Sequence, residues 1–439
     1  MKATRKWISI LSMTVMILVL LIGCSGQSGE DNKTVNGSGT KDKKVTLNFI
    51  RWSNGPALDE EEKDKIKRFN ASHPNIEVKM TLLPWEETFK KIELSLASNN
   101  PVDLFYWDVP AYAYYKKGLI KNLQPYMQSL DMNKYDAKLF EPFKFDNKNM
   151  YVAPENYQTL IFYYNKDLFD KAGVEYPMND WSWDDVLEAS KKLTIRDGDK
   201  VTQFGFDVGA LGNWWGWNAL TEAQGGKLAE NVHEPASVNF ASKEAVQAVK
   251  FLRDMIYEHK VAPDTIQGQA IGGGNLFLTG KIAMTTGGDW DLGAIKEVKD
   301  FKWGMVKLPT WQGQRATPYF MGGYVIADKS KNSDQAWEFI KWAMTENQET
   351  LAKQQSWIPV YKPALDTITP PEWAPEGYKD SRFEWMQNGL IGDIYHLRWR
   401  EAGDKAIGPV GQEIWTNKIP VEEGLKKMND KINEILQKK

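Results

Sequence analysis

Tryptophan next to a polar or acidic side chain follows or ends three successive predicted strands of this chain. Trp52 closes the first strand, Trp85 and Glu86 follow the second, and Trp107 and Asp108 close the third. An indole ring stacks on the apolar face of a sugar ring, and a carboxylate accepts hydrogen bonds from hydroxyl groups. Each tryptophan taken alone could equally cap the edge of a sheet. The three together predict a carbohydrate-binding site.

The densest aromatic cluster lies at residues 213–218, where Trp214, Trp215 and Trp217 are interleaved with asparagines and a glycine. Three indoles so close together cannot all be buried on one face of a helix. We interpret the cluster as a surface on which a sugar stacks, with packing into the core as the alternative. The chain has 19 tryptophans in all, and some of them must belong to the core.

A further segment combines an acceptor with a stacking ring. Gly287 and Gly288 follow a predicted strand over residues 281–285 and precede Asp289 and Trp290. Glycine lets the backbone approach a ligand closely, and the two side chains after it offer one acceptor and one ring. The segment predicts a ligand contact, with an ordinary turn as the alternative.

The N-terminal segment has the pattern of an export signal. Lys2, Arg5 and Lys6 form a basic stretch, and residues 7–22 are uncharged and largely apolar. This apolar run is short for a membrane span and fits a signal peptide. Cys24, the only cysteine, follows a glycine in a pattern that resembles the lipobox of bacterial lipoproteins. The resemblance implies a lipid on Cys24 and a place on the extracytoplasmic face of the cell membrane, and a secretory signal with a chance cysteine is the alternative.

Composition argues against several classes of function. A net charge of −3 with no basic stripe argues against nucleic acid as a partner. With Cys24 used for the anchor, the mature chain has no disulfide, thiol nucleophile or cysteine metal site. The histidines are far apart in sequence, so neither a metal nor a cofactor is expected. They are His73, His233, His259 and His396.

The folded part begins with alternating strands and helices. Strands are predicted at residues 45–52, 76–83 and 102–107, and helices at residues 58–70 and 85–96. This alternation is typical of a parallel sheet with crossover helices. The ligand crevice of such a sheet lies beyond the carboxyl ends of its strands, where the first three tryptophans stand. Apolar residues at helical spacing predict later helices over residues 245–256, 336–343 and 421–435.

Several segments carry a family resemblance. Aromatic residues precede Tyr164 and Asn165, and Leu168, Phe169 and Lys171 follow them. Further blocks follow in order, namely residues 183–184, 277–290, 303–309, 322–327 and 336–340. Together they resemble the extracellular solute-binding proteins of ABC importers, the sugar-type group that includes maltose-binding protein. The resemblance covers essentially the whole mature chain. Asn165 itself is expected to cap the next helix and not to touch ligand.

The family implies an α/β fold of two lobes joined by a hinge, the type II clamshell of periplasmic binding proteins. We place the signal peptide at residues 1–23 and a flexible tether at 24–44. The first lobe is expected at 45–153 plus 315–354, and the second at 154–314 plus 355–439. The chain is expected to cross between the lobes near residue 154, within 309–314 and before residue 359.

The resemblance also implies a receptor and not an enzyme. Such a monomeric receptor would capture an oligosaccharide, a fragment of a plant polysaccharide, between its lobes and deliver it to a permease with a cytoplasmic ATPase. The hydroxyl acceptors would be Asp108, Glu155, Asn156 and Asp289, and the further predicted contacts are Gly323, Tyr324 and Trp357. Two alternatives stay open: a surface glycoside hydrolase that uses two of the carboxylates, and a receptor of the same fold for a non-sugar solute.

Overall fold

The computed structural model describes residues 44–107 and 111–438. The predicted signal peptide, the lipid site Cys24 and nearly all of the tether lie outside the described residues. Asp108 and the side chain of Trp107 lie outside them as well. Across the described ranges, no helix combines the length and the apolar character that crossing a bilayer requires.

A parallel part opens the sheet, as the sequence predicts. β1 (Val45–Trp52) pairs in parallel with β2 (Ile76–Leu83) and with β3 (Leu104–Trp107). The crossover helices are α1 (Pro56–Ser72) and α2 (Trp85–Leu96). The predicted bounds of β1 and β2 are confirmed, and β3 starts slightly later than predicted.

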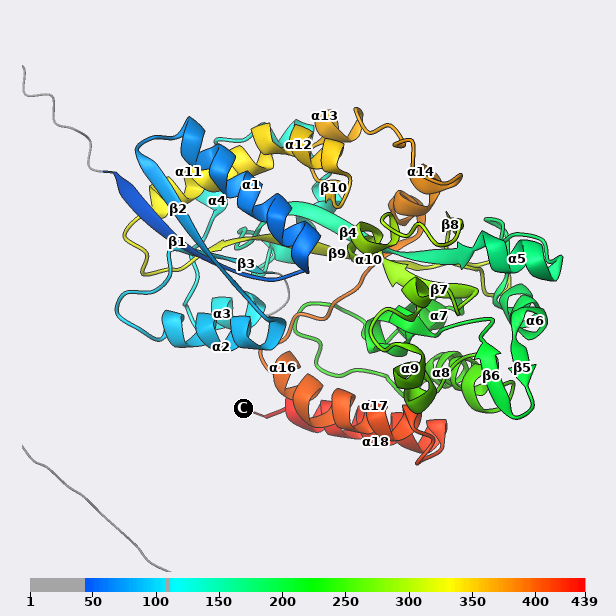
Figure 1. Ribbon diagram of the computed structural model, residues 1–439. Helices are drawn as coiled ribbons and strands as arrows, with labels where there is room; N and C mark the ends of the chain where they lie inside the picture. The colour runs from blue at the N-terminus through cyan, green and yellow to red at the C-terminus, as the bar shows by residue number, and fades with distance from the viewer. Residues whose placement is uncertain (1–43, 108–110, 439) are drawn as a thin grey trace, which may run out of the picture. The chain divides into compact units, whose positions relative to one another are not determined.

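Two long antiparallel strands link this part to the rest of the sheet. β4 (Ala153–Asn165) pairs with β9 (Thr317–Ile326) over its first half, and with β7 (Met284–Gly288) and β8 (Trp303–Val306) over its second half. β9 also pairs with β3, so β4 and β9 run side by side between the parallel strands and β7 (Figure 1). Two short strands, β10 (Ile358–Pro359) and β11 (Gly389–Ile391), complete the sheet. Its order is β10-β4-β9-β3-β1-β2, with β7 and β8 also on β4 and β11 on β9.

The strand predicted over residues 281–285 lies further along the chain. β7 begins at Met284 and includes Gly287 and Gly288, which pair with β4. The two glycines therefore belong to the sheet and not to a turn after it. α10 (Asp289–Ile295) follows them directly. The prediction placed the strand too early because pairing with β4 extends it over residues that carry no side chain.

The remaining elements complete the described unit. The helices are α3 (Ala111–Lys116), α4 (Gln124–Met127), α5 (Lys166–Ala172), α6 (Trp183–Leu193), α7 (Trp214–Ala223), α8 (Lys243–Tyr257), α9 (Thr265–Ile271), α11 (Ser333–Met344), α12 (Glu346–Gln354), α13 (Lys362–Leu365), α14 (Tyr378–Arg382), α15 (Trp385–Asn388), α16 (Trp399–Ala402), α17 (Gly408–Trp415) and α18 (Val421–Leu436). The short strands are β5 (Ile195–Asp197), β6 (Lys200–Gln203), β10 (Ile358–Pro359) and β11 (Gly389–Ile391).

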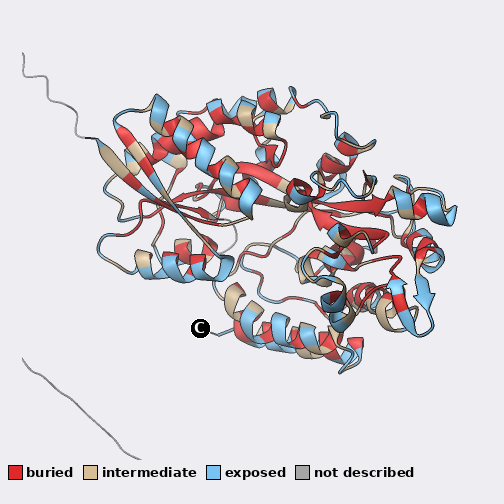
Figure 2. Ribbon diagram, viewed as in Figure 1, coloured by how far each residue is buried: buried red, intermediate tan, exposed pale blue. Residues whose placement is uncertain are grey.

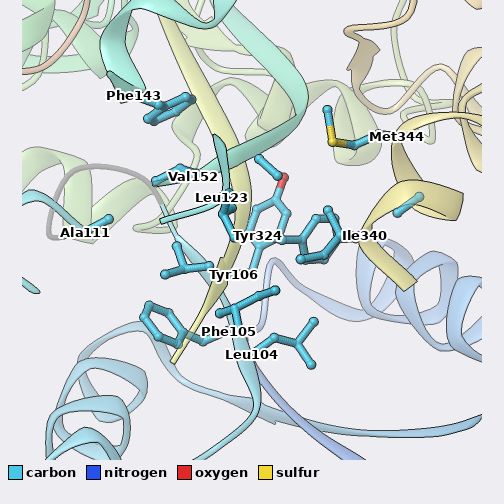
Figure 3. Packing of buried hydrophobic residues seen from close by; sticks show 14 of the residues in the cluster. Leu104, Phe105, Tyr106, Ala111, Leu123, Phe143, Val152, Tyr324, Ile340 and Met344 are labelled. Atoms are coloured by element: carbon cyan, nitrogen blue, oxygen red, sulfur yellow. The ribbon is translucent and has the colours of Figure 1, made fainter. Parts of the chain in front are cut away.

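The side chains around β1, β3 and β9 form the first hydrophobic core. The rings of Tyr106 and Tyr324 meet edge to face in it, with 5.1 Å between their centroids. Figure 3 shows part of this core, with both residues labelled. α11 adds Phe339 and Ile340 from its predicted apolar face, and both are fully buried.

The second hydrophobic core is mostly helical. α8 contributes Val249 and Leu252, and α18 contributes Leu425 and Met428, as their apolar spacing predicts. Figure 2 shows that α17 and α18 are buried on one side and exposed on the other. The apolar stripes of these helices therefore serve packing.

Core membership changes within β4. Tyr157 belongs to the first core and Leu160 to the second, and the crossing predicted near residue 154, which stays a prediction, would lie on this strand. The chain after residue 355, placed in the second lobe, returns at first to the first core. There the ring centroids of Trp385 and Tyr157 are 4.6 Å apart, and β10 pairs with β4. These contacts favour a boundary later than residue 355, and the other lobe boundaries stay predictions.

Asn165 ends β4 and caps α5, as predicted. Its Oδ1 accepts the backbone N–H of Leu168 at 3.2 Å, which satisfies one of the free donors at the start of the helix. The side chain is buried and does not line either cavity described below. This part of the family signature is architectural.

Candidate functional site

A cavity of about 600 Å³ lies next to the second core. Its walls come from the turn η4 (Gly209–Gly212), the start of α7, the region of α9, the end of β7 and α10. These segments are distant in sequence and meet because β7 pairs with β4 while residue 207 bridges to residue 285 beside it.

Two indole rings that contact each other line the cavity, whose apolar wall also includes Trp415 and several aliphatic side chains. Trp215 of α7 and Trp290 of α10 both line it, and both are half-buried. Their rings meet edge to face, with 6.0 Å between the centroids and 89° between the planes. Phe320 of β9 packs against both, at 5.0 Å from Trp215 and 5.7 Å from Trp290. The exposed surface of the two indoles suits the apolar face of a sugar ring.

The glycines of β7 allow the next two cavity side chains to fold back over the strand. A Cβ atom at Gly288 would stand 2.5 Å from the ring of Trp290, and one at Gly287 would stand 2.5 Å from the carboxylate of Asp291. Neither position can carry a side chain without moving its neighbour. Gly287 and Gly288 therefore leave the space that the Trp290 ring and the Asp291 carboxylate occupy next to β7.

Asp207 is the first carboxylate of the cavity. Its Oδ2 accepts the hydroxyl of Thr285 at 3.2 Å, and the backbone N–H of Gly209 also donates to it. Burial raises the pKa of Asp207 above the ordinary value of 3.8, these two hydrogen bonds oppose the rise, and the negative charge of Asp291 adds to it. Gly209 has a φ of +53°, and a Cβ there would stand 2.4 Å from the carbonyl oxygen of Thr286.

Asp291 is the second carboxylate. Its Oδ2 accepts the backbone N–H of Gly288 and its Oδ1 accepts Nδ2 of Asn275, both at 3.0 Å. Burial raises its pKa, and the two hydrogen bonds oppose the rise. An ionised carboxylate has about four acceptor sites, so Asp207 and Asp291, with two donors each, retain capacity for ligand hydroxyls.

Asp264 is a third carboxylate on the wall, and it caps a helix. Its Oδ1 accepts the backbone N–H of Gln267 at 2.8 Å, and the side chain of Gln267 accepts the N–H of Asp264 at 3.0 Å. This capping box fixes the start of α9. Across residues 44–107 and 111–438, no group of three or more histidine, cysteine, aspartate or glutamate side chains is placed to hold a metal ion.

Comparison with known families decides the identity. The family described as bacterial extracellular solute-binding protein matches residues 52–350, more than half of the chain. The chain belongs to this family. An arabinooligosaccharide-binding protein of Halalkalibacterium halodurans is 22% identical over 327 residues, which cover 71% of this solute-binding protein and 68% of that one. An sn-glycerol-3-phosphate-binding periplasmic protein of Shigella flexneri is 24% identical over 333 residues, which cover 70% of this chain and 73% of the relative.

A solved structure confirms the predicted fold class. The ABC substrate-binding protein of Listeria monocytogenes in complex with cycloalternan matches this solute-binding protein with a TM-score of 0.78 at 24% identity. The match covers 90% of this chain and 100% of the Listeria chain. The α/β solute-binding fold of two lobes is therefore the fold of this protein.

The tryptophan cluster of this solute-binding protein divides between the cavity and the core. Trp215 lines the cavity, whereas Trp217 is buried in the second core with its ring 5.4 Å from Phe240. Trp214 also packs near Phe240, at 6.0 Å, and lines a second cavity of about 190 Å³. Helical geometry explains the division, because residues three apart share a face and the residue between them does not.

Three predicted ligand contacts of the solute-binding protein, Glu155, Asn156 and Tyr324, lie together next to residues of the first hydrophobic core. Glu155 is fully buried, accepting Nζ of Lys65 at 2.9 Å and the hydroxyl of Tyr324 at 2.8 Å. Nδ2 of Asn156 donates to the hydroxyl of Tyr106 at 2.8 Å. These groups bond to the protein itself and line neither cavity, so we leave them out of the site proposed below.

Three more predicted contacts are buried in packing positions. Asp289 forms an ion pair with Nε of Arg382 at 2.6 Å and accepts the backbone N–H of Thr159 at 3.0 Å. Trp357 belongs to a small separate cluster of buried residues. Gly323 pairs within the sheet, where a Cβ would stand 2.5 Å from the carbonyl oxygen of residue 153. We leave these three out of the proposed site as well.

Trp52, Trp85 and Glu86 form a group of their own at the carboxyl end of β1. The two indoles lie 4.9 Å apart, edge to face, and Trp85 is 47% exposed. Glu86 is exposed, with its Oε2 3.8 Å from Nη2 of Arg400. This group does not line the cavity, and its contact with ligand stays a prediction.

Asp207, Asp291 and Asn275 line the site but are not among the residues predicted from the sequence. Asp291 was within reach, because it stands next to Trp290 and ends an Asp-Trp-Asp triplet. Asp207 and Asn275 are brought to the site by the bridge to residue 285 and by the bond to Asp291. No local sequence pattern indicates such long-range contacts.

Proposed function

We propose that this solute-binding protein is the receptor of an ABC importer and that it captures an oligosaccharide in the cavity. The observation that carries the proposal is the meeting of two half-buried indoles, Trp215 and Trp290, with two half-buried carboxylates, Asp207 and Asp291. Sugars combine apolar ring faces with hydroxyl groups, and a site of apolar planes with a few fixed acceptors recognises both.

Size and similarity support a ligand of more than one sugar ring. The cavity volume of about 600 Å³ falls in the middle of the range of about 300–1,000 Å³ that is typical of ligand sites. The arabinooligosaccharide-binding relative and the cycloalternan complex support an oligosaccharide. Fragments of plant cell-wall or storage polysaccharide are our proposal for the substrate class.

Capture would be coupled to closure of the two lobes. The first lobe would comprise residues 45–153 and 315–354, together with later segments that pack in the first core, such as β10 and Trp385. The second lobe would contain the cavity, with β4 and β9 as the connection. Trp85 and Glu86 would then contact ligand from the first lobe. A ligand that touches both lobes favours the closed state by its differential affinity, and the permease would recognise that state.

The test of this function is binding without turnover. The purified protein is titrated with arabino-, manno-, cello- and malto-oligosaccharides by calorimetry and tryptophan fluorescence, and the sugars are recovered for analysis. We expect saturable binding, a fluorescence change from Trp215 and Trp290, and intact sugar. Release of new reducing ends would favour the glycoside hydrolase. Binding of peptides or polyamines and of no sugar would favour the receptor for a non-sugar solute.

We further propose that a lipid on Cys24 holds the receptor on the extracytoplasmic face of the cell membrane. The position of this single cysteine after an apolar leader supports the proposal. Cys24→Ala is expected to move the protein from the membrane fraction to the soluble fraction and to leave its affinity for sugar unchanged. Fractionation followed by calorimetry measures both effects. Retention of the variant in the membrane fraction would contradict the anchor.

Sugar binding is expected to weaken on acidification. Burial raises the pKa of Asp207 and of Asp291 above 3.8, and protonation removes acceptor sites. Affinity is therefore full at neutral pH and falls as the pH drops through the raised pKa values. The contribution of these two groups to the stability of the empty receptor changes with pH in the opposite direction. Groups with a raised pKa favour the folded state most below pH 3.8 and lose this effect as the pH rises.

Calorimetry at stepwise lower pH measures the change in affinity. The variant Asp207→Asn with Asp291→Asn is the control, since it has no carboxylate at either position. If the double variant lost as much affinity on acidification as the parent protein does, the pH dependence would come from other groups.

A further inference from the structure

The cavity wall carries negative charge without a countercharge. Asp207, Asp264 and Asp291 line it, and no lysine, arginine or histidine of the described residues does. The hydrogen-bond partners found for these carboxylates are neutral: the Thr285 hydroxyl, backbone N–H groups and the amide of Asn275. The site therefore presents half-buried acceptors with net negative charge to whatever enters it.

The fully buried arginines of the described chain are used elsewhere. Arg382 is paired with Asp289 at 2.6 Å, and Arg51 is paired with Glu62 at 3.1 Å. Neither arginine lines the cavity. An anionic ligand group would lose its water on entry and would meet like charge with no donor cation to replace that water.

We propose that the electrostatics of this cavity select uncharged oligosaccharides and reject those that carry a carboxylate, sulfate or phosphate. Asp207 and Asp291 are the residues that impose the selection. The inference rests on the proposed function and deepens it, since it names the charge class of the sugar. Juxtaposed like charges discriminate strongly against the wrong ligand, whereas neutral hydroxyls are donors that both carboxylates accept.

Membership of the family does not decide this point. The Shigella relative, at 24% identity, is described as binding sn-glycerol-3-phosphate, which is an anion. The charge of the ligand must therefore be set by individual residues of each site. In this chain the residues that meet in the cavity are aspartates.

The experiment compares sugars that differ only in charge. Cellotriose, mannotriose and maltotriose are titrated by calorimetry, and each that binds is compared with the form oxidised to a carboxylate at C6 and with the form carrying an amine there. We expect the carboxylate to weaken binding by at least about 100-fold and the amine to bind no more weakly than the parent. Equal affinity for the neutral and the anionic forms would overturn the selection while leaving the receptor function intact. Failure of every neutral sugar to bind would overturn the proposed function itself and the selection with it.

A variant tests which residues are responsible. Asp207→Asn with Asp291→Asn keeps side-chain size and removes both charges, so the ratio between neutral and anionic affinity should shrink by about 10-fold or more. Asp300→Asn, at an exposed position outside the cavity, is the matched control and should keep the full ratio. Thermal unfolding verifies that each variant is folded. An unchanged ratio in the folded double variant would overturn the role of the two aspartates.

Discussion

Trp215→Ala is expected to lower the affinity for oligosaccharide by about 30-fold or more, whereas Trp217→Ala is expected to destabilise the fold and to leave the site intact. Both residues belong to α7, but Trp215 lines the cavity and Trp217 is 3% exposed within the second core. Truncating an aromatic side chain at the centre of a binding site costs about 2 kcal/mol or more, which corresponds to about 30-fold in affinity. Truncating a large aromatic residue in a core costs about 3–5 kcal/mol of folding free energy.

Calorimetry and urea unfolding on both variants separate the two effects. The pair is a matched control in itself, because the same side chain is removed at two positions of one helix. Trp290→Ala should reproduce the loss of affinity, since its ring meets that of Trp215 at 6.0 Å. If Trp215→Ala and Trp290→Ala both bound oligosaccharide as well as the parent, the cavity would not be the binding site.

The local elements were predictable from the sequence because each follows from short-range periodicity. β1 and β2 have the expected bounds, and the apolar faces of α11 and α18 pack as their spacing indicates. As predicted, the three indoles do not share one face of α7, since Trp215 lines the cavity and Trp214 and Trp217 do not. What the spacing left open was which indole faces the cavity.

The acceptors of the site were less predictable, because whether a carboxylate is free to bind ligand depends on ion-pair partners that are distant in sequence. Asp289 is one of the predicted acceptors, but Arg382, 93 residues later in the chain, forms an ion pair with its carboxylate. Glu155 is another predicted acceptor, and the ammonium group of Lys65, 90 residues earlier, donates a hydrogen bond to its carboxylate. Asp291, only two residues beyond Asp289, does line the cavity, together with Asp207 and Asp264. Sequence identifies residues able to accept a hydroxyl, and long-range ion pairing decides which remain free to do so.

Arg382→Met is expected to lower the free energy of unfolding by about 3–5 kcal/mol, because it leaves Asp289 buried without its partner. Both side chains are fully buried, and the second oxygen of Asp289 accepts the N–H of Thr159 on β4. The same substitution should weaken sugar binding, since Trp290 and Asp291 follow Asp289 in α10 and depend on its position. Lys426→Met, in the exposed ion pair with Asp430, is the control and should cost at most about 1 kcal/mol.

The pH dependence of the Arg382→Met variant identifies the cause of its instability. Burial raises the pKa of Asp289, and the guanidinium of Arg382 opposes the rise, so removing the guanidinium raises the pKa further. A carboxyl with a raised folded-state pKa supports the fold below its unfolded pKa and loses that contribution as the pH rises. The destabilisation should therefore shrink at acid pH, and adding Asp289→Asn should restore much of the stability at neutral pH. Urea unfolding at both pH values measures these effects. A loss that is equal at both pH values and unrelieved by Asp289→Asn would mean that Arg382 acts through packing, and that α10 is held in place by contacts other than this ion pair.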